Sequence, residues 1–278
     1  MNRDYFSCGA RLSYHEYGSG ELIVFLHPTP LDHAYWLPLI KRLPGSRTIA
    51  PDLRGHGLSE LGEGLPVGGF GLVPEAPVLT LTQYADDVIT LLEHLGNPKA
   101  VFAGCSIGGY ILLELWRRIP QKIKGLAFVC SKPQPDTAQG QVKRAENIAK
   151  ARAEGVSGLF DGMANSLLGA TARGKHPEMV AEVRARMTLT PQALVAVQAG
   201  LATRPDSLPT VATINVPVLA IAGGEDGAVT PAEMEALKAA PGGCEFHLLG
   251  DAGHFAAYEQ PELAAEIFSS WLRKSGLA

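Results

Sequence analysis

Short apolar runs alternate with longer amphipathic segments along most of this chain. The runs are rich in Val, Ile, Leu and Ala, which is typical of strands that are buried on both faces of a sheet. We predict strands over residues 10–17, 22–26, 47–50, 99–104, 125–130, 216–222 and 244–249. The segments between them predict helices over residues 33–43, 82–95, 110–116, 231–240 and 261–273. This alternation indicates an α/β fold, with a mostly parallel central sheet and helices on both of its faces.

One long segment interrupts the alternation. Residues 133–211 have a mostly helical pattern and contain no strand-like run. The simplest interpretation is a helical insertion that caps one end of the sheet. We therefore expect a core formed by residues 1–132 and 212–278, and a helical cap formed by residues 133–211. Residues 60–79 are rich in glycine and proline and predict a long irregular loop.

Composition and charge narrow the range of functions. The chain has 278 residues, 46% hydrophobic and 19% charged, which is an ordinary balance for a globular protein. A net charge of −4 without a basic stripe gives no support for binding to nucleic acid or to an anionic membrane. The polar N-terminus and the lack of a membrane-length apolar stretch favour a cytoplasmic protein. The four cysteines are scattered and form no Cys-x-x-Cys pair, so neither a zinc site nor a disulfide framework is expected.

A Gly-x-Ser-x-Gly sequence at residues 104–108 stands between a predicted strand and a predicted helix. It places Ser106 at a sharp turn, where flanking glycines relieve crowding of the backbone. The N–H groups and the positive dipole end of the following helix would lie beside a nucleophile that becomes negatively charged. This pattern is typical of a nucleophile elbow. The alternative is a tight strand–helix turn with an inert serine.

A serine nucleophile needs a base, and the base needs an acid that orients it. His254 lies in a short glycine-containing loop directly after the last predicted strand, and Asp226 directly follows the strand before it. Glu225 is the alternative acid. Asp251 lies too close to His254 in sequence to orient it easily, and is interpreted as a brace of the turn. The order serine, aspartate, histidine is the one expected of the elbow architecture.

With these motifs the chain resembles the alpha/beta-hydrolase superfamily, in its serine-nucleophile branch with a helical cap. The resemblance covers nearly the full length. Four motifs agree in order: His27-x-x-Pro30, Asp52-x-Arg54-Gly55-x-Gly57-x-Ser59, the elbow at Ser106, and Gly253-His254. The resemblance implies that Ser106 is the nucleophile, His254 the general base and acid, and Asp226 the acid that orients His254.

The resemblance also implies an oxyanion hole formed by the N–H groups of Thr29 and Ile107. Pro28 stands where this motif usually has glycine. Proline lacks an N–H, but the donor that the hole needs belongs to Thr29, so we expect the hole to survive. Three residues in or next to the motifs are candidates for lining the pocket: His27, Trp36 and Phe255. Core packing is the alternative for Trp36 and Phe255.

Other residues near the motifs are interpreted as structural. Asp52, Arg54 and His56 belong to a family motif but not to the triad, and a network that braces the loop is the preferred interpretation. Cys105 is adjacent to the nucleophile, and we expect its side chain to point away and pack as a small hydrophobe.

The identity of the nucleophile separates the branches of the superfamily. A serine at position 106 disfavours dehalogenases and epoxide hydrolases, which use aspartate there. We expect a serine esterase or lactonase that cleaves a small carboxylic ester or lactone through an acyl-serine, without metal or organic cofactor. Residues 202–218 resemble the end of the cap in enol-lactonase-like members. The alternatives are a carbon–carbon bond hydrolase or perhydrolase with the same triad, and a non-catalytic receptor for a small ligand. The sequence leaves the oligomeric state open.

Overall fold

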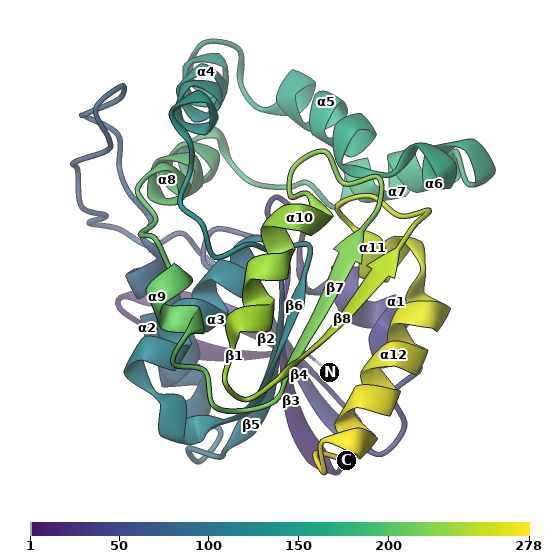
Figure 1. The fold of residues 1–278 in the computed structure, drawn as a ribbon. Coiled ribbons are helices and arrows are strands. Elements are labelled where there is room, and N and C mark those ends of the chain that lie inside the picture. Colours follow the sequence, from purple (N-terminus) through teal and green to yellow (C-terminus); the bar gives the residue numbers. More distant parts are fainter. Residues whose placement is uncertain (1) are drawn as a thin grey trace.

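The computed structural model describes residues 2–278, which form an eight-stranded sheet between layers of helices (Figure 1). The strand order is β1-β2-β4-β3-β5-β6-β7-β8. The pairs β1–β2 and β2–β4 are antiparallel, and every other neighbouring pair is parallel. The strands are β1 (Asn2–Ser7), β2 (Ala10–Tyr17), β3 (Glu21–Leu26), β4 (Ser46–Pro51), β5 (Ala100–Cys105), β6 (Ile123–Val129), β7 (Val218–Gly223) and β8 (Cys244–Leu249). The predicted α/β fold class is confirmed.

Helices cover both faces of this sheet, as Figure 1 shows. The helices α2, α3 and α9 lie on one face, and α1, α11 and α12 lie on the other. Their apolar sides pack on strands β3, β5, β6 and β7, whose residues are almost all buried. The bounds are α1 (Leu37–Ile40), α2 (Leu81–His94), α3 (Ile107–Arg118), α9 (Leu208–Val211), α10 (Pro231–Met234), α11 (Ala256–Glu259) and α12 (Pro261–Lys274).

A separate group of helices lies over the carboxyl ends of the parallel strands (Figure 1). It consists of α4 (Ala138–Glu154), α5 (Ser157–Leu167), α6 (Ala170–Lys175), α7 (Glu178–Ala185) and α8 (Pro191–Ala202). The N–H of His254 donates to the carbonyl of Leu167 at 2.8 Å, so this layer is tied to the loop that follows β8. The division into a core and a cap at residues 133–211 stays a prediction.

The structure differs from the predicted elements in a few short segments. The predicted helix at 33–43 is a 3-10 turn, His33–Trp36, followed by the single turn of α1. The strand β1 was not predicted, because half of its residues are polar and exposed and the pattern there is weak. Residues 60–79 contain no helix or strand, only isolated bridges, as expected of a loop. Within residues 2–278, no helix combines the length and apolar character needed to cross a membrane.

Candidate active site

Ser106 occupies the turn between β5 and α3 with φ 52° and ψ −118°. A non-glycine residue in this region is strained, and such strain concentrates at functional sites. The turn is possible only because its neighbours are small. A Cβ atom on Gly104 would lie 2.4 Å from the backbone of Gly108, and one on Gly108 would lie 2.2 Å from the carbonyl oxygen of Leu26. The two glycines are therefore required by close backbone approach.

His254 and Asp226 meet at the same edge of the sheet. Strands β7 and β8 are parallel neighbours, so the loops that follow them leave the sheet side by side. The Nδ1 atom of His254 lies 2.8 Å from Oδ2 of Asp226, and both side chains are buried. The other oxygen, Oδ1, accepts hydrogen bonds from the N–H groups of Ala228 at 2.7 Å and Val229 at 3.0 Å.

These contacts decide the charge of Asp226. Burial raises the pKa of its carboxyl, but the electrostatic attraction and hydrogen bond of the His254 ring and the two backbone donors outweigh burial, so the pKa lies below its usual value. The carboxylate is therefore ionised at neutral pH. An ionised Asp226 fixes the proton of His254 on Nδ1 and leaves Nε2 free to accept one.

The alternative acids point elsewhere. Glu225 accepts a hydrogen bond from the N–H of Thr171 at 2.8 Å and another from its hydroxyl at 2.5 Å, so its carboxylate is held at the start of α6. Asp251 is exposed and lies 3.8 Å from Nζ of Lys175. Of the three carboxylates considered from the sequence, Asp226 is the one that hydrogen-bonds to His254.

The N–H groups of Thr29 and Ile107 have no hydrogen-bond partner among residues 2–278. The hydroxyl of Thr29 lies 2.9 Å from Nε2 of His56, and Nδ1 of His56 lies 3.0 Å from the carbonyl oxygen of Arg54. A carbonyl only accepts, so Nδ1 carries the proton and Nε2 accepts from the hydroxyl. Burial lowers the pKa of His56 to about 4, which keeps the ring neutral.

Charged residues after β4 form a network of hydrogen bonds that braces the loop. Oδ1 of Asp52 accepts from the N–H of His33 at 2.8 Å, and Oδ2 accepts from the N–H of Leu58 at 2.9 Å. Arg54 forms a bidentate salt bridge with Asp87 in α2, in which Nε donates to Oδ2 at 2.8 Å and Nη2 donates to Oδ1 at 2.6 Å. These contacts lie outside the group formed by Ser106, His254 and Asp226.

Sequence reasoning missed Glu259, which holds the loop around His254. Its half-buried carboxylate accepts hydrogen bonds from the N–H groups of Gly253 at 2.9 Å, Phe255 at 3.1 Å and Gly169 at 3.0 Å. The signal was a glutamate that follows His254 by five residues within α11. That helix is a single turn, and its pattern is too short to predict.

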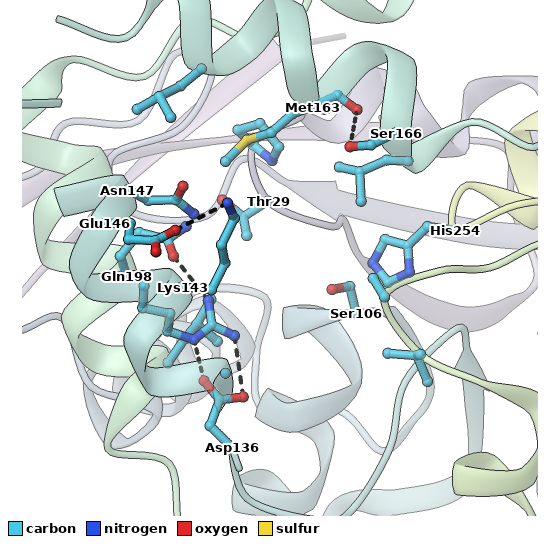
Figure 2. A pocket seen from close by; sticks show the side chains of 18 of the residues that line it. Thr29, Ser106, Asp136, Lys143, Glu146, Asn147, Met163, Ser166, Gln198 and His254 are labelled. Carbon is cyan, nitrogen blue, oxygen red and sulfur yellow. Dashed lines mark hydrogen bonds and ion pairs between the residues drawn. The ribbon is translucent and has the colours of Figure 1, made fainter. Parts of the chain in front are cut away.

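A cavity of about 960 Å³ lies above the elbow, between the sheet and helices α4, α5 and α8. Thr29, Ser106 and His254 line it, and Figure 2 shows Ser106 and His254 next to each other at its wall. The site thus joins a candidate nucleophile, a histidine with a polarised ring and a space for a small molecule.

Three residues expected along the pocket lie in the core instead. Nε2 of His27 accepts from the N–H of Leu53 at 2.8 Å, inside the sheet edge. The ring centroids of Trp36 and Phe25 lie 5.0 Å apart, and the ring of Phe255 packs against that of Tyr35. All three are buried and are absent from the residues that line the cavity.

One group within residues 2–278 has spacing suited to a metal ion: the candidate ligand atoms of Cys130, Asp226 and His254 lie within 4.8 Å of one another. Asp226 and His254 are already hydrogen-bonded to each other. Burial raises the pKa of the Cys130 thiol well above its usual value, and Sγ lies 3.6 Å from the carbonyl oxygen of Gly253. A protonated thiol is a poor metal ligand, so this group fits hydrogen bonding better than metal coordination.

Comparison with known proteins agrees with this geometry. A 3-oxoadipate enol-lactonase of Acinetobacter baylyi is 27% identical over 90% of this chain and 88% of its own. A thermophilic esterase from Thermogutta terrifontis, solved with malate bound, superposes with a TM-score of 0.88, 28% identity and 99% coverage of both chains. An enol-lactonase from Burkholderia xenovorans superposes with a TM-score of 0.85, 26% identity, and 98% and 100% coverage. The sequence pattern of the alpha/beta hydrolase family matches residues 23–267, and this chain belongs to that family.

Proposed function

We propose that this protein is a serine hydrolase that cleaves a small carboxylic ester or lactone through an acyl-serine intermediate. The observation that supports this best is the hydrogen bond between His254 and Asp226 beside Ser106, which occupies a strained turn and faces a cavity. The similarity to an esterase and to enol-lactonases, which extends over nearly the whole chain, agrees with it.

In the proposed mechanism, Oγ of Ser106 attacks the substrate carbonyl while Nε2 of His254 takes the hydroxyl proton. Negative charge develops on the carbonyl oxygen, and the free N–H groups of Thr29 and Ile107 stabilise it. His254 then gives its proton to the departing alkoxide, leaving the acyl group on Ser106. His254 next deprotonates a water molecule, which attacks the ester, and the carboxylic acid leaves as the serine hydroxyl is restored.

Asp226 has an electrostatic role in both halves of this cycle. It remains ionised, holds the imidazole in the tautomer with a proton on Nδ1, and stabilises the imidazolium that forms twice. No proton transfer to Asp226 is required. The mechanism needs no metal or organic cofactor.

The test is hydrolysis of p-nitrophenyl esters from acetate upward, together with a set of lactones, by wild type and by the Ser106→Ala variant. We expect turnover that the variant loses, by a factor of about 10³ or more. Circular dichroism and thermal unfolding show whether the variant keeps its fold. Equal turnover by wild type and a folded Ser106→Ala variant would contradict the proposal. Absence of turnover with all these substrates would favour carbon–carbon bond cleavage or a receptor.

A further inference from the structure

The cavity wall carries more positive than negative charge. It contains five Lys and Arg side chains but two carboxylates, those of Asp136 and Glu146. The whole chain, in contrast, has a net charge of −4. A concave wall of one charge sign concentrates ions of the opposite sign. The charge balance therefore favours an anionic molecule in the cavity.

One part of this surplus comes from two arginines that share one aspartate. Arg144, in α4, and Arg204, after α8, both hydrogen-bond to Asp136. Burial raises the pKa of Asp136, but the two guanidinium groups outweigh it and hold the pKa below its usual value. Asp136 is thus ionised, and the three side chains, which form the Arg144–Asp136–Arg204 cluster, carry a net positive charge.

This surplus charge is desolvated. Side-chain exposure is 19% for Arg144, 3% for Arg204 and 8% for Asp136. A buried positive charge without a counter-ion is costly, and the cost is removed when an anion binds. Two other cations of the cavity wall have a carboxylate partner of their own. Nζ of Lys143 lies 3.2 Å from Glu146, and Nζ of Lys132 lies 2.5 Å from Glu233.

The cluster also has N–H donors that make no hydrogen bond within the part of the protein that the structure describes. A guanidinium has five N–H donors. Arg204 uses Nε for the carbonyl of Gln134 and Nη1 for Asp136 and the carbonyl of Leu201, while Nη2 has no hydrogen-bond partner among residues 2–278. Arg144 gives Nη1 to Gln198 at 3.0 Å. Both arginines face the cavity, so these donors are open to a bound molecule.

The cluster lies within reach of the elbow. The guanidinium of Arg204 stacks on the ring of Tyr110, 4.6 Å from its centroid. Tyr110 lies at the end of the first turn of α3, and its N–H donates to the carbonyl of Ser106 at 3.2 Å. In the view of Figure 2, Asp136 and Gln198 lie across the cavity from His254, with Ser106 between them.

We propose that the Arg144–Asp136–Arg204 cluster binds a carboxylate of the substrate, so that the ester or lactone this enzyme cleaves carries a second, free carboxylate. The inference rests on the proposed function, because it assigns the substrate class of the same cavity. Arginine suits this task, since its planar fork matches the two oxygens of a carboxylate. The reacting carbonyl would lie at Ser106 and the free carboxylate at the arginine pair.

The first test is binding to the Ser106→Ala variant, which cannot form the acyl-serine. Calorimetry at low salt compares the monomethyl esters of succinate, glutarate and adipate with the corresponding dimethyl esters. We expect at least one monoester to bind about tenfold more tightly than its diester, because a charge-assisted hydrogen bond contributes more than a neutral one. Equal affinity within all three pairs would overturn the inference.

Charge variants assign the effect to the cluster. In Arg144→Gln, Asp136 keeps Arg204 as its partner, so no buried carboxylate is left unpaired. We expect the monoester to lose about tenfold in affinity while the diester changes less than about twofold. We expect the second variant, Arg204→Gln, to show the same selective loss of monoester affinity. The matched control is Arg152→Gln, which removes one positive charge from the same helix, α4, but outside this cavity. A monoester preference that survives in both cluster variants would overturn the inference.

Hydrolysis of the same esters by the unmodified protein separates this inference from the proposed function. Turnover of monoesters and diesters at equal kcat/KM would leave the serine hydrolase proposal standing and contradict the carboxylate site. Tight monoester binding that depends on Arg144, without hydrolysis of any ester, would support the carboxylate site and contradict the proposed reaction.

Discussion

The imidazole of His56 accepts a hydrogen bond from the hydroxyl of Thr29, with 2.9 Å between Nε2 and Oγ1. The ring is itself fixed, because its Nδ1–H donates to the carbonyl of Arg54 at 3.0 Å. The contact joins the loop after β3 to the loop after β4. Since the N–H of Thr29 is a proposed oxyanion donor, the position of that donor depends on a residue outside the triad. His56 is therefore a positioning residue in this account.

Replacing His56 by Phe removes the acceptor and keeps a ring in the buried space. We expect kcat to fall about tenfold with a smaller change in KM, because a neutral hydrogen bond contributes about 0.5–1.5 kcal/mol. Loss of an oxyanion donor itself costs about 10²–10³ in kcat. A fall in that larger range, or none at all, would contradict the positioning role. Steady-state kinetics on a p-nitrophenyl ester measure the effect.

The Thr29→Val variant tests the same contact from its other end. It removes the hydroxyl but keeps the N–H and the shape of the side chain. Alone it should resemble His56→Phe, and the double variant should be no slower than the slower single variant. Additive losses in kcat would show that the two residues act independently.

Asp226 and Glu225 are adjacent carboxylates with different partners, which allows a matched comparison. Asp226→Asn removes the charge beside His254 and should lower kcat by about 10³–10⁴, since the imidazole is no longer held in the active tautomer. Glu225→Gln removes the same charge one residue away, where the carboxylate contacts Thr171 in α6. It should keep kcat within about threefold. The reverse ranking would assign the orienting role to Glu225.

Buried histidines make the stability of this protein depend on pH. Burial lowers the pKa of His27 to about 3 and that of His56 to about 4, whereas the unfolded chain binds these protons near pH 6.5. Below pH 6.5 the unfolded state therefore holds more protons than the native state. The free energy of unfolding should fall on acidification from pH 6.5 to about 4, by up to about 1.4 kcal/mol per pH unit for each of these histidines.

Urea unfolding at a series of pH values measures this slope. The His56→Gln variant should reduce it by up to about 1.4 kcal/mol per pH unit, because one of the titrating groups is gone. His176→Gln is the matched control, because it makes the same substitution at an exposed position. An unaltered slope in His56→Gln would mean that the buried ring is not the source of the pH dependence.

Much of the architecture could be predicted from the chain because the central strands β3, β5, β6 and β7 are mostly apolar and almost completely buried. The strand ends place Asp226 and His254 in loops that leave the sheet together, and the parallel pairing of β7 and β8 brings them to 2.8 Å. The crowding around Gly104 and Gly108 explains why the elbow pattern is so specific.

What could not be predicted depends on side chains from distant segments. The pairing of Asp136 with Arg144 and Arg204 depends on how the helices over the sheet pack, and periodicity says nothing about that. Trp36 and Phe255 follow motif positions, yet their rings pack downward into the core rather than along the cavity. The contact between His56 and Thr29 depends on how two irregular loops, those after β4 and β3, are placed relative to each other.

The central claim is that Ser106 forms the covalent intermediate. Intact-protein mass spectrometry after reaction with a fluorophosphonate measures this directly, because the probe phosphonylates an activated serine and releases fluoride. We predict one adduct per chain in the wild type, located at Ser106 by peptide mapping, and none in Ser106→Ala. An adduct on another residue, or an equal adduct in the folded Ser106→Ala variant, would contradict the account.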